Sequence, residues 1–514
     1  MGEESVWEPE LTTLANARAR ALAMGGEERV RRQHENGKLT VRERLEKLLD
    51  PGSFLELGML ATQQSNRVQM EGRYTAADGL VVGYGRIQGR EVMVGAEDFT
   101  VMGGSEGRIG GLKRERMLDI ALERKLPVIW LLDGVGARTG ESLRGSWVGG
   151  RFFLTMSRLS GVVPQIGLVL GPCAGGPALM APLQDFIVMV KGISMLAAGG
   201  PPVVEAATGE KVTKEELGGS AIHCRISGVA DNEAESEEDA FEMCRRYLSY
   251  FPPSSDQLPP LVPKDEVVPP PPGDILSLFP RSSKRPYDMR KVLDLIVDRD
   301  SRFEIKPDYA PNMITTLARI GGHSVGILAN QPLVKAGIID AAAADKATHF
   351  MQLCDAFHIP LIFFADVPGF MTGTKAEREG TLRRGLRMAH VLGQATVPMI
   401  SVVVRKAFGM GGVAMCGSGM GQVLTLAWPT AEFGTMPLSG AIRAAHKRDL
   451  EAGRVTLEEL EKGYAAYSDL LGPLESFQVD DLVHPNETRD RIIRVLDAVR
   501  ATTTKVGYKH GIMP

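Results

Sequence analysis

Residues 126–133 read Leu-Pro-Val-Ile-Trp-Leu-Leu-Asp, and this stretch decides the fold because the chain contains its pattern twice. Residues 359–366 read Ile-Pro-Leu-Ile-Phe-Phe-Ala-Asp, so the proline and the final aspartate both recur 233 positions later. Each copy is a continuous apolar run of strand length that ends in an acidic residue. Such runs are typical of strands in a sheet that is covered on both faces.

The surroundings of the two copies also match. A predicted strand at 91–95 and a predicted helix at 113–125 precede the first copy, while a strand at 323–329 and a helix at 341–358 precede the second. After each copy comes a second matching segment, VPQI from residue 163 and VPMI from residue 397, at an offset of 234. An apolar strand and a Gly-rich turn follow in both cases. The near-constant spacing predicts two copies of one α/β domain.

The length of 514 residues exceeds what one hydrophobic core usually supports. Residues 252–273 hold nine of the 31 prolines, which favours an extended linker over helix or central strand. We therefore predict an N-terminal domain at 1–251, a Pro-rich linker at 252–273 and a C-terminal domain at 274–514. The acidic run at 231–239 is interpreted as a solvated helix start, since it lacks EF-hand spacing.

Composition excludes several classes of protein. The formal net charge of −4 argues against nucleic acid or an anionic membrane as the main partner. No apolar segment has the length of a membrane span, and the acidic N-terminus resembles neither a secretory signal nor a transit peptide. The five cysteines form no CxxC pair, so we expect no metal site. Scattered cysteines suit a reducing compartment, and we expect a cytoplasmic protein.

The two Gly-rich turns carry the predicted chemistry. Residues 171–177 read GPCAGGP and residues 407–412 read AFGMGG, each between a predicted strand and a predicted helix. Glycine lets the main chain approach a ligand closely, and the first N–H groups of a helix have no partner inside it. Such a turn can bind a phosphate or stabilise an oxyanion as it forms on a thioester or ureido carbonyl. The alternative is a purely structural strand-to-helix turn.

Competing motifs are weaker. No GxxxxGK[ST] loop is present, which argues against a P-loop NTPase. Residues 103–107 (GGSEG) fit the GxSxG nucleophile elbow of α/β-hydrolases, with Ser105 as nucleophile and His223 as the nearest candidate base. No general base stands out elsewhere. A reaction whose cofactor supplies its own base would explain that absence.

Eight further stretches together resemble one family, the carboxyltransferase (β) subunits of biotin-dependent acyl-CoA carboxylases of the propionyl-CoA and methylcrotonyl-CoA type. The resemblance covers nearly the whole chain. Its motifs are DGLVVGYG from 78, DFTVMGGS from 98, GPCAGG from 171, ELGG from 216, NQP from 330, DAF from 355, DVPGF from 366 and WPTAE from 428.

The resemblance implies a fold of two duplicated crotonase/ClpP-like domains and a mechanism. Carboxybiotin, carried on a partner chain, releases CO2, and the ureido anion left on biotin removes the α-proton of the acyl-CoA. The resulting enolate attacks CO2. The resemblance places the enolate oxygen at the amides of Gly175 and Gly176 and the biotin carbonyl at those of Met410 and Gly411. Neighbouring substrate-binding positions are Ala174, Gly409, Gly412 and Val413.

The resemblance also implies partners. Biotin carboxylase and the biotin carboxyl carrier are expected as separate chains, and the chain itself as a homo-oligomer built from dimers, often a hexamer. Basic residues in 138–151 are candidates for contacts with CoA phosphates. The second turn departs from the family's usual RKAYGGAY at Met410, whose side chain we expect to narrow the biotin pocket. Val413 is small and apolar, which favours an uncharged ligand if it lines a pocket.

Three alternatives stay open. A biotin-dependent acyl-CoA decarboxylase subunit runs the same half-reaction backwards. A biotin-independent crotonase-fold thioester hydrolase or isomerase needs a carboxylate or histidine base at the Gly175-Gly176 turn. A subunit that has lost activity is the third alternative, and the change at Met410 is the reason to consider it.

Overall fold

The computed structural model describes residues 6–64, 68–142, 150–282, 285–436, 438–465 and 471–514. The chain forms two compact units, one of residues 1–257 with 508–512 and 514, the other of residues 258–507 with 513. The division falls inside the stretch 252–273, where a single bridge between Leu261 and His323 is the one piece of regular pairing. The predicted domain bounds stay a prediction. The tail at 508–512 groups with the first unit because Ile512 N donates to Ser160 Oγ (2.8 Å).

The first unit is built on a seven-stranded sheet in the order β1-β2-β3-β4-β5-β7-β9. The pairs β1–β2 and β2–β3 are antiparallel, and the remaining pairs are parallel. A separate parallel pair joins β6 and β8. The strands are β1 Leu55–Leu57, β2 Leu80–Ile87, β3 Arg90–Glu97, β4 Val128–Leu132, β5 Gln165–Val169, β6 Pro172–Ala174, β7 Phe186–Val190, β8 Met195–Ala197 and β9 Asn232–Ala234.

The second unit repeats this plan in an eight-stranded sheet. Its order is β10-β11-β12-β13-β14-β15-β17, with β16 paired to β14. The pairs β10–β11 and β11–β12 are antiparallel, and the others are parallel. The strands are β10 Phe303–Ile305, β11 Met313–Ile320, β12 His323–Asn330, β13 Leu361–Val367, β14 Met399–Phe408, β15 Leu424–Ala427, β16 Glu432–Gly434 and β17 Asp481–Leu482.

The helices of the first unit include an N-terminal arm, α1 to α3. They are α1 Glu8–Leu22, α2 Glu27–Glu35, α3 Val41–Leu48, α4 Arg108–Arg124, α5 Thr139–Ser142, α6 Arg151–Leu159, α7 Gly176–Met180, α8 Pro201–Thr208, α9 Lys214–Gly218, α10 Ser220–Ile222 and α11 Glu237–Tyr250. Those of the second unit are α12 Met289–Asp294, α13 Ala341–Ala356, α14 Thr374–Arg378, α15 Thr381–Gln394, α16 Gly409–Ala414, α17 Leu438–Ala445, α18 Lys447–Glu451, α19 Leu457–Ala465, α20 Gly472–Glu475 and α21 Thr488–Thr502.

The strand registers establish the duplication. In the first unit Met93 pairs with Val128 across β3–β4, and in the second Gly326 pairs with Leu361 across β12–β13. Both members of the second pair lie 233 positions after those of the first. The predicted α/β fold with two duplicated domains is therefore confirmed.

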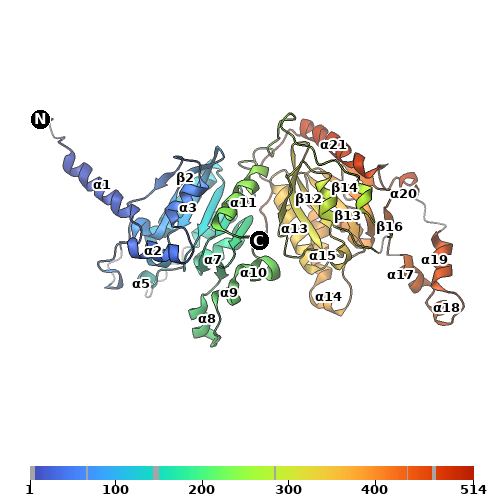
Figure 1. Ribbon diagram of the computed structural model, residues 1–514, viewed down its shortest axis with the longest axis horizontal. Coiled ribbons are helices and arrows are strands. Elements are labelled where there is room, and N and C mark those ends of the chain that lie inside the picture. The colour runs from blue at the N-terminus through green and yellow to red at the C-terminus, as the bar shows by residue number, and fades with distance from the viewer. Residues whose placement is uncertain (1–5, 65–67, 143–149, 283–284, 437, 466–470) are drawn as a thin grey trace. The chain divides into compact units, whose positions relative to one another are not determined.

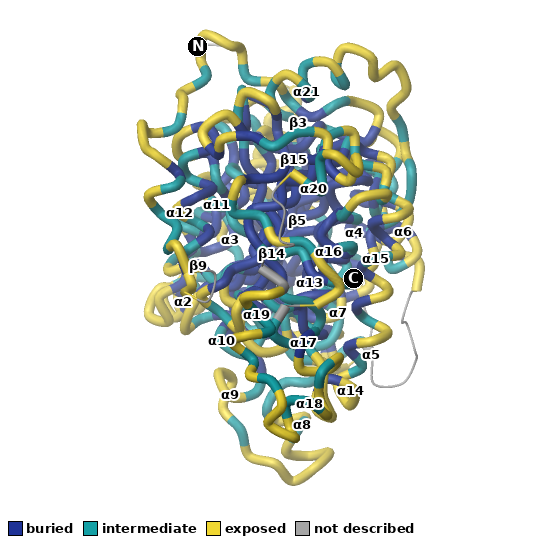
Figure 2. Tube along the Cα trace, turned by 90° about the vertical axis from the view of Figure 1, so that its right-hand side faces the viewer, coloured by how far each residue is buried: buried dark blue, intermediate teal, exposed yellow. Residues whose placement is uncertain are grey.

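The central strands are buried throughout, as their apolar sequences predict. Every residue of β4 and of β13 is buried. In the first unit α4 packs against β2 and β3, and α11 packs against β5 and β7. In the second unit α13 packs against β11 and β12 and lies beside α15 (Figure 1). The tube around β5 and β14 is accordingly dark blue in Figure 2, the colour of buried residues.

Candidate active site

The first Gly-rich turn joins β6 to α7. Gly175 has φ +64°, a conformation that favours glycine, and α7 begins at Gly176. Pro177 is thus the second residue of the helix, where its missing N–H costs nothing. The Gly175 amide, a predicted oxyanion donor, donates to Ala198 O (3.1 Å). The Gly176 amide has no acceptor among the described residues, because it is the first N–H of its helix.

The segment after β4 supports this turn through the main chain. Ala174 N donates to Gly134 O (3.1 Å). A Cβ on Gly136 would lie 2.8 Å from Ala174 O and 3.4 Å from the amide nitrogen of Gly176. No side chain fits at residue 136, whose φ of +84° also favours glycine. The repeated segment that ends in Asp133 therefore positions the turn, although it is far away in sequence.

A carboxylate that the sequence analysis did not identify borders the turn. Glu106 Oε2 lies 3.7 Å from the position of a Cβ on Gly176. Arg114 Nη1 donates to the same oxygen (2.7 Å), and the Glu106 side chain is 18% exposed. Burial raises the pKa of Glu106, while Arg114 opposes this effect. The signal in the sequence is the acid next to Ser105 in GGSEG, a pattern that by itself indicates a nucleophile elbow.

The second turn joins β14 to α16. Gly409 has φ +53°, and a Cβ on Gly411 would lie only 2.7 Å from Gly369 Cα. Gly369 follows β13 just as Gly136 follows β4, so the second turn has an equivalent support. The amides of Met410 and Gly411 are at the start of α16 and have no acceptor among the described residues. The Met410 side chain is 41% exposed.

A cavity of about 430 Å³ lies beside the second turn. Three of the predicted substrate-binding residues, Gly409, Gly412 and Val413, line it. None of its lining residues carries a charge, and most of the walls are apolar. Ser401 also lines it, and its buried Oγ has no hydrogen-bond partner among the described residues. The cavity thus suits an uncharged ligand that brings a polar atom to Ser401.

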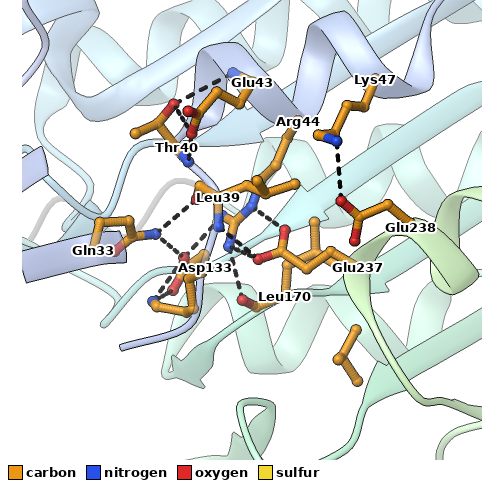
Figure 3. Close-up of polar contacts among 12 residues, drawn as sticks. Gln33, Leu39, Thr40, Glu43, Arg44, Lys47, Asp133, Leu170, Glu237 and Glu238 are labelled. Carbon is orange, nitrogen blue, oxygen red and sulfur yellow. Dashed lines mark hydrogen bonds and ion pairs between the residues drawn. The ribbon is translucent and has the colours of Figure 1, made fainter. Parts of the chain in front are cut away.

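A buried polar cluster fixes Asp133 at the end of β4 (Figure 3). Lys38 Nζ donates to both carboxylate oxygens of Asp133 (2.9 Å each), and Arg44 Nη1 donates to one of them (2.8 Å). Gln33 Nε2 donates to the same group (3.1 Å). Arg44 also binds Glu237, so two cations and two anions face each other inside the unit. Because both cations come from the N-terminal arm, this arm is part of the support of the first turn.

The carboxyl of Glu97 completes the cluster. Its Oε2 accepts a hydrogen bond from Asp133 N (2.8 Å). Burial raises the pKa of Glu97 to about 8, so the group is mostly neutral at pH 7. Its neutrality avoids a further buried negative charge beside Asp133.

Asp366 in the second unit has a simpler environment. Arg405 Nε donates to Asp366 Oδ2 (3.0 Å), and the Arg405 guanidinium lies over the Tyr287 ring. The aspartates of the repeated segment therefore pair with buried arginines in both units.

Comparison with known proteins decides the family. The family model of the carboxyl transferase domain matches residues 32–512. The chain belongs to the carboxyl transferase domain family. It is 39% identical to the methylmalonyl-CoA decarboxylase subunit alpha of Veillonella parvula over 497 residues, covering 96% of this chain and 97% of that protein. It is 37% identical to the propionyl-CoA carboxylase carboxyltransferase subunit of Haloferax mediterranei, covering 99% of both chains.

A solved structure agrees with this membership. The crystal structure of transcarboxylase 12S, a hexamer with methylmalonyl-coenzyme A bound, matches with a TM-score of 0.92 and 38% identity, covering 100% of this chain and 99% of that one. The reaction class of the chain is therefore carboxyl transfer.

The contacts of Ser105 and His223 differ from those of an elbow nucleophile and its base. Ser105 Oγ donates to Met102 O (2.8 Å) and is buried. His223, the candidate base, instead contacts Leu196 O and Ser227 Oγ through its two ring nitrogens (2.8 and 2.9 Å). The GxSxG pattern is a structural loop in this carboxyltransferase.

The candidate phosphate contacts in 138–151 are only partly described, since 143–149 lie outside the described residues. Arg138 is buried, and its Nη1 binds Asp78 (2.5 Å) and Glu141 (2.8 Å). It is therefore committed to the protein interior. Arg151 is exposed and pairs with Asp119 (2.6 Å).

Two further features bear on the expectations from sequence. The acidic run at 231–239 was expected to be a solvated helix start, but its residues 232–234 form strand β9 and only its last three residues begin α11. Glu237 is buried against Arg44 and is not solvated. Among the described residues no helix is long and apolar enough to cross a membrane, and no group of three His, Cys, Asp or Glu side chains could hold a metal ion.

Proposed function

We propose that this carboxyltransferase moves a carboxyl group from carboxybiotin to the α (or vinylogous) carbon of an acyl-CoA, with the thioester at the first turn and biotin at the second. The observation that carries the proposal is the equivalent placement of two turns with unpaired main-chain N–H groups at their helix starts. Main-chain donors held in fixed positions stabilise charge as it develops on an oxygen.

At the first turn the Gly176 N–H is the donor for the enolate oxygen. Because Gly175 N donates to Ala198 O, Gly175 contributes its left-handed backbone conformation to the site instead of a second donor. Ala174 closes the same turn on the strand side. The Gly136 backbone behind the turn holds the donor in place, so little reorganisation accompanies the reaction.

At the second turn Met410 and Gly411 supply donors for the biotin carbonyl. The uncharged cavity lined by Gly409, Gly412 and Val413 fits a neutral ring system, which supports biotin as the group bound there. Carboxybiotin supplies CO2 and leaves a ureido anion that can remove the α-proton of the thioester. We expect the exposed Met410 side chain to narrow the biotin pocket, although Met410 is not among the residues that line the cavity.

We propose that biotin arrives on a separate chain, together with a biotin carboxylase. The matched family domain fills residues 32–512, so most of the chain is carboxyltransferase. A homo-hexamer built from dimers is supported by the hexameric assembly of the transcarboxylase 12S structure. The five buried free cysteines support a reducing cytoplasm.

The second candidate is an acyl-CoA decarboxylase subunit, because one similar relative is a methylmalonyl-CoA decarboxylase subunit. It uses the same two turns with the carboxyl group moving from the acyl-CoA to biotin.

The test is a transfer assay with the purified chain in both directions. One reaction contains propionyl-CoA and a carboxylated biotin carrier, and the other contains methylmalonyl-CoA and free biotin. We expect carboxyl transfer in both, with the faster direction separating carboxylase from decarboxylase. Free CoA released without any carboxyl transfer would instead identify a biotin-independent thioester hydrolase.

A further inference from the structure

The side chain of Glu106 has one oxygen that nothing in the described protein satisfies. Oε2 accepts from Arg114 Nη1 (2.7 Å), whereas Oε1 is buried and has no hydrogen-bond partner among the described residues. Buried polar atoms are nearly always paired, so an unpaired one calls for a proton, a water or a ligand.

Glu106 is held at the open face of the first turn. Its Oε2 is the one described atom, apart from the chain neighbours and helix backbone of Gly176, within 4 Å of a Cβ position on Gly176. The main chain fixes this placement, because Glu106 N donates to Gly136 O (2.7 Å) and Arg138 N donates to Glu106 O (2.7 Å). The carboxylate and the turn therefore share Gly136 as their common support.

Burial and neighbouring charges act on the Glu106 carboxyl in opposite directions. Burial raises its pKa, and the carboxylates of Asp78 and Glu115 act in the same direction. Arg114 favours the ionised form, and its guanidinium is fixed over the Phe152 ring (3.8 Å). A carboxyl with these opposing influences suits general acid–base catalysis.

We propose that Glu106 enolises an acyl-CoA bound at the first turn even when no carboxybiotin is present, which gives the chain an α-proton exchange activity. The Glu106 carboxylate takes a proton from Cα, the C–H electron pair forms the C=C bond, and the carbonyl π pair moves to the oxygen held by Gly176 N–H. The carboxyl exchanges its proton with solvent and returns one to Cα, so no oxidant or leaving group is needed.

This inference rests on the proposed function, since it needs the thioester oxygen at Gly176. The experiment incubates the purified chain with propionyl-CoA in D2O and follows deuterium in the acyl group by mass spectrometry. Carboxyl transfer from a carboxylated carrier is measured in parallel. Exchange well above the protein-free blank is expected. Transfer without exchange overturns the role of Glu106 alone, whereas absence of both overturns the proposed function.

Variants then test whether Glu106 is the residue responsible for the α-proton exchange. Glu106→Gln is expected to slow it by about 100-fold or more, the usual contribution of a general base. Glu123→Gln changes an exposed acid on α4, the helix that follows Glu106, and is the control that keeps the wild-type rate. Unchanged exchange in Glu106→Gln, or a loss that accompanies lost propionyl-CoA binding in calorimetry, overturns the inference.

The pH profile gives an independent readout that does not require removal of Glu106. Arg114→Gln removes the cation that favours the ionised form of Glu106. The pH at which the exchange rate increases should therefore be higher in this variant than in the wild type. If the pH–rate profiles of Arg114→Gln and the wild type coincide, Glu106 is not the base.

Discussion

Lys113 and Lys346, which lie 233 positions apart, occupy equivalent buried sites on α4 and α13. Lys113 Nζ donates to the main-chain oxygens of Ala77 and Leu80. Lys346 Nζ donates to three, those of Lys306 (2.6 Å), Tyr309 (2.9 Å) and Met313 (2.7 Å). Each ammonium thus ties its helix to neighbouring main chain without a carboxylate bonded to it.

This burial predicts a pH-dependent stability. Burial lowers the pKa of Lys346 to about 7 and that of Lys113 to about 8, against about 10.4 in an unfolded chain. At pH values between the folded-state and unfolded-state pKa of each lysine, the unfolded chain binds more protons than the folded chain. The free energy of unfolding therefore rises with pH and falls as the pH drops toward 7. From pH 7 to 8.5 Lys346 should add about 1–2 kcal/mol. Denaturant titrations at both pH values measure this, and Lys346→Met should show a smaller rise than the wild type. Equal rises would contradict the assigned pKa.

Gly176→Pro removes the proposed oxyanion donor. Proline is tolerated at the first helical position, so the fold should persist while carboxyl transfer slows by about 100- to 1,000-fold. Gly176→Ala is the matched control, because its Cβ meets only ordinary contact distance and its N–H remains. Steady-state rates of carboxyl transfer to propionyl-CoA distinguish the two variants. Similar rates in the two variants would remove Gly176 from the mechanism.

Val413→Phe fills the cavity beside the second turn. Because the added ring occupies space assigned to the neutral ligand, we expect the KM for free biotin to rise at least tenfold, while acyl-CoA binding stays unchanged. Val423→Phe places the same change at an exposed site that does not line the cavity. An equal effect in both variants would rule out the cavity as a biotin subsite.

Arg44→Met breaks the buried cluster around Asp133. Removing one partner leaves the carboxylates of Asp133 and Glu237 undercompensated, which typically costs about 3–5 kcal/mol of stability. The exposed pair Arg31–Glu28 provides the comparison, and Arg31→Met should lower the free energy of unfolding far less than Arg44→Met does, because solvent screens an exposed pair. Denaturant unfolding measures both. A small loss of stability in Arg44→Met would mean that the remaining residues of the cluster rearrange to compensate the two carboxylates.

Ser105→Ala should leave carboxyl transfer intact. The hydroxyl donates only to a main-chain oxygen three residues earlier, so its loss affects the loop and not the reacting groups. A large drop in thioester turnover, measured as CoA release, would restore Ser105 as a nucleophile.

The sequence predicted the sheets and the duplication well because both depend on local patterns. The apolar runs ending at Asp133 and Asp366 are continuous, and their spacing is nearly constant, so strands and repeats follow from residue order. It did not predict that the Gly175 amide donates a hydrogen bond to Ala198 O, because this contact depends on how β8 lies beside β6. Nor could it place Glu106 beside Gly176, because that contact spans 70 positions and is set by the backbone of Gly136.

The buried cluster also defines how much of the N-terminal arm the reaction centre needs. The family domain begins at residue 32, immediately before Gln33, the first residue to contact Asp133. A shortened version starting near residue 32 would keep every polar partner of that aspartate. One starting after Arg44 would leave the Asp133 carboxylate without its cations, next to the turn where we propose that the thioester binds. For protein engineering, α1 is the segment to trim and residues 33–44 are the segment to preserve.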